Sequence, residues 1–233
     1  MKITIKKEFH DMGLRKLGQY FDYPLLKACA TYDELEELCQ KGARHNVRMV
    51  TVTPAAVSFC VRRGGTPVSA AIDFPMGQAT FKSKVYEAKD AIANGASEVE
   101  YVVNLTEVKK RNKNYLTTEM RGIVDMCRIS GVVVKAVFEN CYLTDEEKKF
   151  LCTIANEVRP DYIKTSTGLG TGGATVYDVL LMRQYTDSCV SILASGDIKI
   201  WEDAENLIDA GASRISTSHT ITILNELARN GVK

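Results

Sequence analysis

Two lysines stand inside apolar segments that are typical of buried β-strands. Lys135 lies between Val134 and Ala136, and Lys164 follows Ile163. Burying a cation is costly, and burial beside a second cation lowers the pKa of a lysine amine. An amine that is partly neutral near pH 7 can attack a carbonyl carbon and form a Schiff base. The two lysines therefore indicate carbonyl chemistry, although each could instead extend an aliphatic stem to a solvated or paired ammonium group.

Carboxylates occur at positions that would face the same cavity. Glu100 lies in the apolar segment 98–104, and Glu139 shares a face with Lys135 in the segment 132–139, because side chains two apart on a strand point the same way. A carboxylate beside a reactive lysine can pair with an ammonium group or move protons during the reaction.

The most distinctive stretch follows Lys164 directly and reads Lys164-Thr-Ser-Thr-Gly168-Leu-Gly-Thr-Gly-Gly-Ala174-Thr175. Its glycines allow the backbone to approach a ligand closely. We therefore expect Thr167 and Gly168 to contact substrate. A glycine-rich connection before a helix could have the same composition, but a strand lysine leading directly into it favours a functional site.

Positioning these residues requires a repeated strand–helix arrangement. Seven apolar, β-rich segments are found at residues 47–52, 67–74, 98–104, 132–139, 161–166, 190–195 and 214–218. Segments with helical spacing of apolar residues lie at 33–45, 81–94, 115–129, 145–158, 176–185, 201–210 and 221–229. This alternation predicts parallel strands joined by crossover helices.

An eighth strand is expected at residues 17–22, after a helix at about residues 4–15. Eight units in 233 residues fit an α/β protein of one domain, residues 1–233, folded as a (β/α)8 TIM barrel with an extra N-terminal helix. The alternative is an open doubly wound sheet, which is disfavoured because no G-x-G-x-x-G follows the first strand.

In a (β/α)8 barrel the active site lies at the carboxyl ends of the strands. The loops after strands seven and eight often bind a phosphate through backbone amides and a helix N-terminus. The first of these loops carries Gly196 and Asp197, and the second carries Ser218 and His219. We expect these four residues to contact substrate, although the Asp197 carboxylate would repel an anion unless it only caps a turn.

Composition excludes several functional classes. Thirty Lys+Arg and 29 Asp+Glu give a formal net charge of +1, so no long-range field attracts nucleic acid or an anionic membrane. No apolar run approaches the roughly 20 residues that span a bilayer, and residues 1–10 contain no signal-peptide core. The seven cysteines form no C-x-x-C and have no histidine at zinc-ligand spacing, which indicates a reduced, cytoplasmic protein without a metal site. A catalytic thiol is the other interpretation.

From about Asp22 to Ser218 the chain resembles the deoxyribose-phosphate aldolase family, which consists of class I (Schiff-base) aldolases with a (β/α)8 fold. The stretch from Tyr162 to Thr175 is similar to the family's sequence around its Schiff-base lysine, which gives that role to Lys164. Further matching motifs are Val134-Lys-Ala-Val-Phe-Glu139, Leu143-Thr-Asp-Glu146, Phe74-Pro-Met-Gly77 and Val85-x-Glu-Ala88.

The resemblance implies reversible aldol cleavage of 2-deoxy-D-ribose 5-phosphate, or of a related small sugar phosphate, by a cytoplasmic homo-oligomer, often a dimer. No metal or organic cofactor is expected. Lys164 would attack the carbonyl, Lys135 would lower its pKa, and Glu100 would move protons through water. The expected substrate contacts are Asp22, Thr167, Gly168, Gly196, Asp197, Ser218 and His219.

The sequence departs from the family pattern inside the expected pocket. Glu100 replaces an aspartate, Leu193 replaces a second active-site lysine, and Asp197 replaces a glycine. The family's Asp-His-Thr and paired serines read Asp22-Tyr23-Pro24 and Ser218-His219. Three functions therefore remain open. They are the family's aldolase reaction, a same-fold lyase with a changed substrate that could lack phosphate, and a catalytically weak binding or regulatory paralogue.

Overall fold

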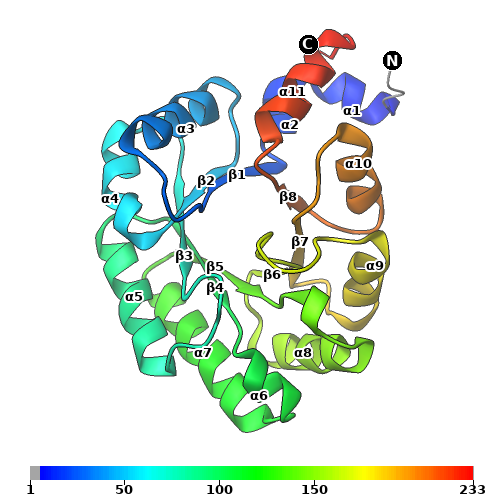
Figure 1. Cartoon of the computed structure of the whole chain (residues 1–233). Coiled ribbons are helices and arrows are strands. Elements are labelled where there is room, and N and C mark those ends of the chain that lie inside the picture. Colours follow the sequence, from blue (N-terminus) through cyan, green and yellow to red (C-terminus); the bar gives the residue numbers. More distant parts are fainter. Residues whose placement is uncertain (1–5, 233) are drawn as a thin grey trace.

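Eight parallel strands pair in sequence order, and the last strand closes on the first to form a barrel. The computed structural model describes residues 6–232, and Figure 1 shows the strands surrounded by helices. The strands are β1 (Phe21–Leu25), β2 (Met49–Val52), β3 (Val68–Ile72), β4 (Glu98–Val102), β5 (Val133–Val137), β6 (Tyr162–Lys164), β7 (Ser191–Ser195) and β8 (Arg214–Ser216). The predicted (β/α)8 barrel is thereby confirmed.

Helices connect successive strands and cover the outside of the barrel. They are α3 (Tyr32–Arg44), α4 (Pro54–Arg63), α5 (Phe81–Ala93), α6 (Leu105–Lys109), α7 (Lys113–Ile129), α8 (Asp145–Val158), α9 (Val176–Tyr185), α10 (Trp201–Asp209) and α11 (Thr220–Arg229), with a 3-10 turn η1 (Asn140–Tyr142) before α8. Two of them, α3 and α8, begin with capping boxes in which Thr31 pairs with Glu34 and Thr144 pairs with Glu147. These reciprocal hydrogen bonds satisfy first-turn amides and fix where each helix begins.

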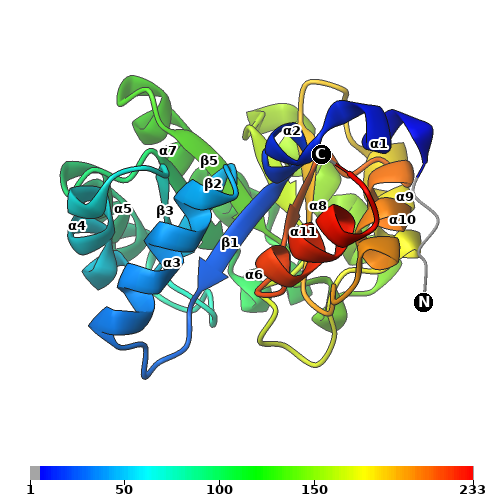
Figure 2. The ribbon, with the colours of Figure 1, turned by 90° about the horizontal axis from the view of Figure 1, so that it is seen from above.

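The N-terminal region differs in detail from the prediction. The expected helix at residues 4–15 is instead two short helices, α1 (Lys7–Met12) and α2 (Leu14–Gly18), separated by Gly13 at φ 80°. Residues 4 and 5 of that expected helix lie outside the described residues. The first strand begins at Phe21 rather than at residue 17, because Leu17 and Gly18 belong to α2. Figure 2 shows α2 beside α11, next to which the chain enters β1.

The strands present two different faces. Outward side chains such as Val99, Ala136 and Ile163 are fully buried in the hydrophobic core that the helices cover. The alternate residues Glu100, Lys135 and Lys164 are also buried, but they are charged. Alternation along a strand therefore directs the charged set into the barrel. In the part of the chain that the structure describes, no helix is long and apolar enough to cross a membrane.

Candidate active site

Lys164 and Glu100 form a direct ion pair inside the barrel. Lys164 ends β6 and Glu100 lies in β4, and the amine Nζ donates to Glu100 Oε1 at 2.8 Å. Both side chains are at most 1% exposed. The other oxygen, Glu100 Oε2, has no hydrogen-bond partner among the described residues. The carboxylate therefore has an oxygen free to receive a proton while it holds the amine.

Lys135 lies beside this pair on β5, the strand between β4 and β6. Its Nζ is 2.7 Å from Glu98 Oε2, donates to Asp22 Oδ2 at 2.8 Å, and is 4.0 Å from Glu100 Oε2. Burial acts to lower the pKa of Lys135, but Asp22 and Glu98 outweigh it and raise that pKa above its usual value. Lys135 is therefore a cation, and the carboxylates of Asp22 and Glu98 balance its charge locally.

Arg214, at the start of β8, completes the charged interior. Its guanidinium donates to Asp22 and to both oxygens of Glu98 at 3.0 Å. Burial opposes ionisation of the Asp22 carboxyl, but Lys135 and Arg214 together lower its pKa. The three cations Lys135, Lys164 and Arg214 thus face the three carboxylates Asp22, Glu98 and Glu100. Such balance is required because an unpaired buried charge is costly.

A cavity of about 370 Å³ opens above Lys164 at the carboxyl ends of the strands. It is bounded by the segment after β1 and by the loops after β6, β7 and β8. Its lining residues are Pro24, Leu25, Leu26, Lys27, Lys164, Thr167, Gly168, Leu169, Ser195, Gly196, Asp197, Ile198, Lys199, Ser216, Thr217, Ser218 and His219. Pockets of roughly 300–1,000 Å³ commonly hold small ligands, so the cavity can accept a small carbonyl compound.

Close backbone contact shapes the loop after β6. The Thr167 amide donates to both carboxylate oxygens of Glu139, at 3.2 and 3.3 Å. A Cβ atom on Gly173 would lie 2.2 Å from the carbonyl carbon of Gly196, and the Ala174 amide donates to the Gly196 carbonyl at 3.1 Å. Glycine at residue 173 is therefore required for the loops after β6 and β7 to meet at the cavity wall. Glu139 holds this loop rather than entering the cavity.

The last wall is the entry into α11. The Thr217 hydroxyl donates to the Ile198 carbonyl at 2.6 Å and accepts from the His219 amide at 3.0 Å. The Thr220 hydroxyl lies 3.3 Å from the Asp22 carbonyl, which ties α11 to β1. Ser218 and His219 therefore line the cavity at the N-terminal end of a ten-residue helix, and such an end favours negative charge.

Asp197 occupies an unusual position in the loop after β7. Its φ of 58° lies in the left-handed region, which glycine adopts readily and other residues adopt at a cost. Asp197 lines the cavity, and no hydrogen bond to its side chain is found among residues 6–232. The hydrogen bond that would make Asp197 a turn cap is therefore not found among these residues. At the start of the adjacent helix α10 it is Asp203 that accepts a hydrogen bond, from the Lys199 amide at 2.9 Å.

The predicted site residues thus fall into two layers. Lys164 joins the layers, because it pairs with Glu100 below and lines the cavity above. Glu100, Lys135 and Asp22 lie below it inside the barrel, and Asp22 does not line the cavity. The upper layer contains Thr167, Gly168, Gly196, Asp197, Ser218 and His219. Their roles toward substrate stay predictions.

Sequence reasoning missed several residues of this site. Glu98 and Arg214 hold Lys135 and Asp22 in place, although Glu98 lies two residues before Glu100, on the same face of the strand. Lys27 and Lys199 add cations to the cavity lining, and because both stand in loops, no strand periodicity indicates them. Among the described residues, no cluster of three or more potential metal ligands is found.

Several known proteins are similar to this chain over most of its length. No family model matches the chain. The deoxyribose-phosphate aldolase of Bacteroides thetaiotaomicron is 39% identical over 226 residues, which cover 96% of this chain and 95% of that protein. The deoxyribose-phosphate aldolase of Lactobacillus acidophilus is 40% identical over 217 residues, or 92% of each chain.

Solved structures give the same result. An aldolase named QR15 superposes with a TM-score of 0.87 at 32% identity, and the match covers 91% of this chain and 95% of that one. The tetrameric deoxyribose phosphate aldolase of Aeropyrum pernix superposes with a TM-score of 0.84 at 25% identity, and the match covers 97% and 99% of the two chains. With relatives this similar over nearly the whole length, and with a paired lysine at the floor of its cavity, the chain belongs to the deoxyribose-phosphate aldolase family.

Proposed function

We propose that this protein is a class I aldolase in which Lys164 forms a Schiff base with an aldehyde. The observation that carries the proposal is the placement of a buried amine at the floor of a cavity, 2.8 Å from a buried carboxylate. A lysine in its neutral form attacks a carbonyl carbon, and the resulting carbinolamine loses water to give an iminium ion. A carboxylate within hydrogen-bond distance of the amine can carry the protons that these steps transfer.

Aldol cleavage follows from the electron demand of the iminium ion. The hydroxyl on the carbon β to the iminium carbon loses its proton. The bond between the α and β carbons then breaks, and its electron pair moves toward the nitrogen. The product on Lys164 is an enamine, and the other fragment leaves as an aldehyde. Protonation of the enamine carbon and addition of water then release the second aldehyde. Glu100, whose Oε2 lacks a partner among the described residues, serves as the proton carrier in this scheme.

We propose 2-deoxy-D-ribose 5-phosphate as the leading substrate, which would give acetaldehyde and glyceraldehyde 3-phosphate. The curated relatives are named for a deoxyribose phosphate. In this chain, Lys199, Ser218 and the start of α11 line the upper cavity, and these are groups that attract a phosphate. Lys135 supports the reaction by its charge, which lies beside Glu100 on the side away from the cavity.

Borohydride trapping tests the Schiff base directly. Incubation with acetaldehyde and sodium borohydride should leave one reduced ethyl adduct, and peptide mass spectrometry should locate it on Lys164. Lys164→Met should abolish both the adduct and turnover. The matched control is Lys199→Met, which removes another lysine from the same cavity and should leave the adduct intact. An adduct that persists in Lys164→Met, or none in the wild type, would reject the proposal.

A second candidate is aldol cleavage of an unphosphorylated sugar, and Asp197 favours it. Asp197 lines the same cavity at a backbone conformation that glycine adopts more readily, and a carboxylate near the substrate repels a phosphate dianion. Comparing kcat/KM for 2-deoxyribose with and without its 5-phosphate decides between the two. Asp197→Gly should raise kcat/KM for the phosphate ester about tenfold if charge repulsion limits its binding, and Asp197→Asn separates charge from backbone effects.

We also propose that the protein forms a homo-oligomer, with a dimer as the simplest form. Helix α9 leaves Val176, Tyr177, Leu180 and Tyr185 between 41% and 59% exposed, and contiguous exposed apolar residues often mark an interface. The Aeropyrum pernix relative is described as tetrameric, so the number of copies is open to measurement. All seven cysteines are free, which suits the reducing cytoplasm expected from the sequence.

A further inference from the structure

A second cavity, of about 540 Å³, lies at the opposite end of the barrel from Lys164. It is formed by α2 with the preceding Gly13, by the end of α3 and by the second half of α11. The helices of this fold run antiparallel to the strands, so the end of α3 and the later residues of α11 lie at the amino ends of the strands. The aldolase proposal makes no use of this cavity.

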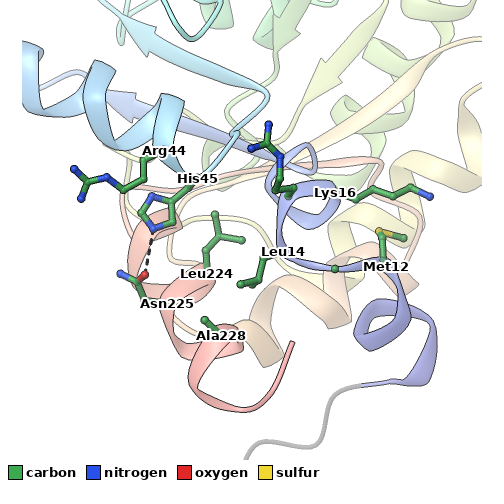
Figure 3. A pocket seen from close by; sticks show the side chains of 10 residues that line it. Met12, Leu14, Lys16, Arg44, His45, Leu224, Asn225 and Ala228 are labelled. Carbon is green, nitrogen blue, oxygen red and sulfur yellow. Dashed lines mark hydrogen bonds between the residues drawn. The ribbon is translucent and has the colours of Figure 1, made fainter. Parts of the chain in front are cut away.

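The floor of this cavity is apolar. Leu14, Leu224 and Ala228 lie in its middle, with Met12 at one edge (Figure 3). Leu224 is almost fully buried, so the floor belongs to the packed part of the protein. A ligand with an apolar body could therefore remove its surface from water here.

The charged residues of the lining are all of one sign. Arg15, Lys16 and Arg44 line the cavity, and no carboxylate does. Figure 3 shows Arg44 and Lys16 on opposite sides of the apolar floor. Within residues 6–232, the side chains of these three residues make no ion pair. Their long stems allow the exposed charged groups to reach over the opening.

A polar wall closes the α3 side. His45 Nδ1 lies 3.0 Å from the Lys41 carbonyl oxygen, and Nε2 lies 3.1 Å from Asn225 Oδ1 (Figure 3). The contact with Asn225 joins the end of α3 to α11 across the cavity edge, and the contact with Lys41 lies within the end of α3; together they orient the imidazole ring. The wall is therefore built before any ligand arrives, which reduces the ordering cost of binding.

We propose that this cavity is a binding site for a small organic anion, with an apolar ring or chain on the Leu14–Leu224 floor and a carboxylate, sulfonate or phosphate at the rim. Charge complementarity indicates this class of ligand, because the described lining contains one apolar floor, three cations without an ion-pair partner among residues 6–232, and no carboxylate. The volume fits a small ligand, since such sites measure roughly 300–1,000 Å³. An occupant would leave the cavity above Lys164 open, because the two cavities share no lining residue.

The proposal is tested with a pair of fluorescent probes that differ in charge. The anionic probe is 8-anilinonaphthalene-1-sulfonate, and the neutral probe is N-phenyl-1-naphthylamine, which has the same aromatic body without the sulfonate. Titration of the full chain should show saturable binding of the anionic probe, with a Kd at least tenfold lower than that of the neutral probe. Equal affinity for the two probes, or no saturable binding of the anion, would overturn the proposal.

Variants then locate the probe. The double variant Arg15→Glu/Arg44→Glu should weaken binding of the sulfonate at least tenfold, and Ala228→Trp, at an exposed position on α11, should block it by filling the cavity. Lys89→Glu on α5 is a matched charge reversal on another exposed helix face and should change nothing. Lys199→Glu, at the other cavity, should also leave the Kd unchanged. If Lys199→Glu weakens binding and the double variant does not, the probe lies in the aldolase cavity and the proposal is wrong.

Circular dichroism and sedimentation velocity keep the result interpretable. Each variant should retain the wild-type helix content, because all the substituted side chains are exposed. The sedimentation coefficient of the wild type should not change with the probe. A shift to a smaller species on addition of the probe would show that the probe displaces a second copy of the chain from this surface, and it would reject the small-anion site.

Discussion

The amine of Lys164 on β6 reaches across β5 to donate a hydrogen bond to Glu100 Oε1 on β4, at 2.8 Å. The two residues are not on neighbouring strands, so their long side chains meet across the intervening strand β5 on the inner face of the barrel. Lys135, on the strand between them, lies 4.0 Å from the other oxygen of Glu100. Glu100 thus lies between two cations. Replacing this carboxylate should therefore affect both the reaction at Lys164 and the stability of the charged barrel interior.

Glu100→Gln should reduce kcat of aldol cleavage by about 100-fold or more, because a positioned acid–base group typically contributes 10²- to 10⁴-fold. Glu100→Asp keeps a carboxylate on a stem one methylene shorter, so its loss should be clearly smaller. Steady-state kinetics of both variants, with Tm recorded beside them, provide the measurement. A small loss in Glu100→Gln together with a larger loss in Glu100→Asp would indicate that the side chain only fills space.

Much of this site could be predicted from the sequence because strand periodicity carries the information. Lys135 and Lys164 stand out as charges in apolar strands, and Glu100 lies on the same face of its strand as the charged residues of the barrel interior. The pairing of Lys135 with Glu98 and Asp22 could not be predicted, since it depends on which strands meet across the barrel. The cations of the barrel interior are therefore matched by an equal number of carboxylates, which the two lysines alone do not indicate.

The fold, like the site, could be predicted from the sequence only in part. The crossover helices with capping boxes at Thr31 and Thr144 were predictable, because local hydrogen bonds define their starts. Helix α4 was not predicted, although Thr53 is its N-cap and Pro54 occupies its first turn, which together are a common helix start; only one residue separates this helix from the end of β2 at Val52. The first strand was predicted about four residues early, since the apolar Leu17 belongs to α2 instead.

Asp22→Asn should lower the free energy of unfolding by about 3–5 kcal/mol, because removal of one buried partner leaves cations uncompensated. Asp22 accepts hydrogen bonds from both Lys135 and Arg214 and is fully buried. For a chain of this size the change corresponds to a fall in Tm of roughly 6–20 °C. Lys149→Met is the matched control, since it breaks an exposed pair with Glu146 and should cost less than about 1 kcal/mol. A similar Tm for both variants would contradict the prediction.

The same pair of proteins should reveal a defined pH dependence. The folded state lowers the pKa of Asp22 from 3.8, so its contribution to stability is complete above that value and is lost as the pH falls through the folded pKa. The folded state raises the pKa of Lys135 from 10.5, so its contribution is complete below that value and is lost as the pH rises through the folded pKa. The Tm difference between wild type and Asp22→Asn should therefore be constant from about pH 5 to pH 9 and shrink below pH 3.8. A difference that grows in acid would disprove this linkage.

Leu193→Lys should place an additional cation beside the Schiff-base lysine. Leu193 is fully buried, and the strand register sets it beside Lys164 on one side and Arg214 on the other. Like-charge repulsion favours the neutral form of an amine, so the rate of borohydride trapping at pH 7 should rise about tenfold, while Tm falls. Leu193→Met has similar size without charge and should leave the rate near that of wild type. Equal trapping rates in both variants would show that charge at residue 193 does not reach Lys164.

Leu180→Glu should shift the protein toward monomers. Leu180 is 52% exposed on α9, between the exposed Tyr177 and Tyr185, and a charge placed at the centre of an apolar interface must be desolvated without a partner. Light scattering during size-exclusion chromatography at micromolar concentration should show an oligomer for the wild type and at least a tenfold weaker association for the variant. Ile129→Glu replaces a still more exposed aliphatic residue at the end of α7 and should remain oligomeric. Dissociation by Ile129→Glu alone would indicate that the interface lies at α7 and not at α9. A monomeric wild type would contradict the proposal that the protein forms a homo-oligomer.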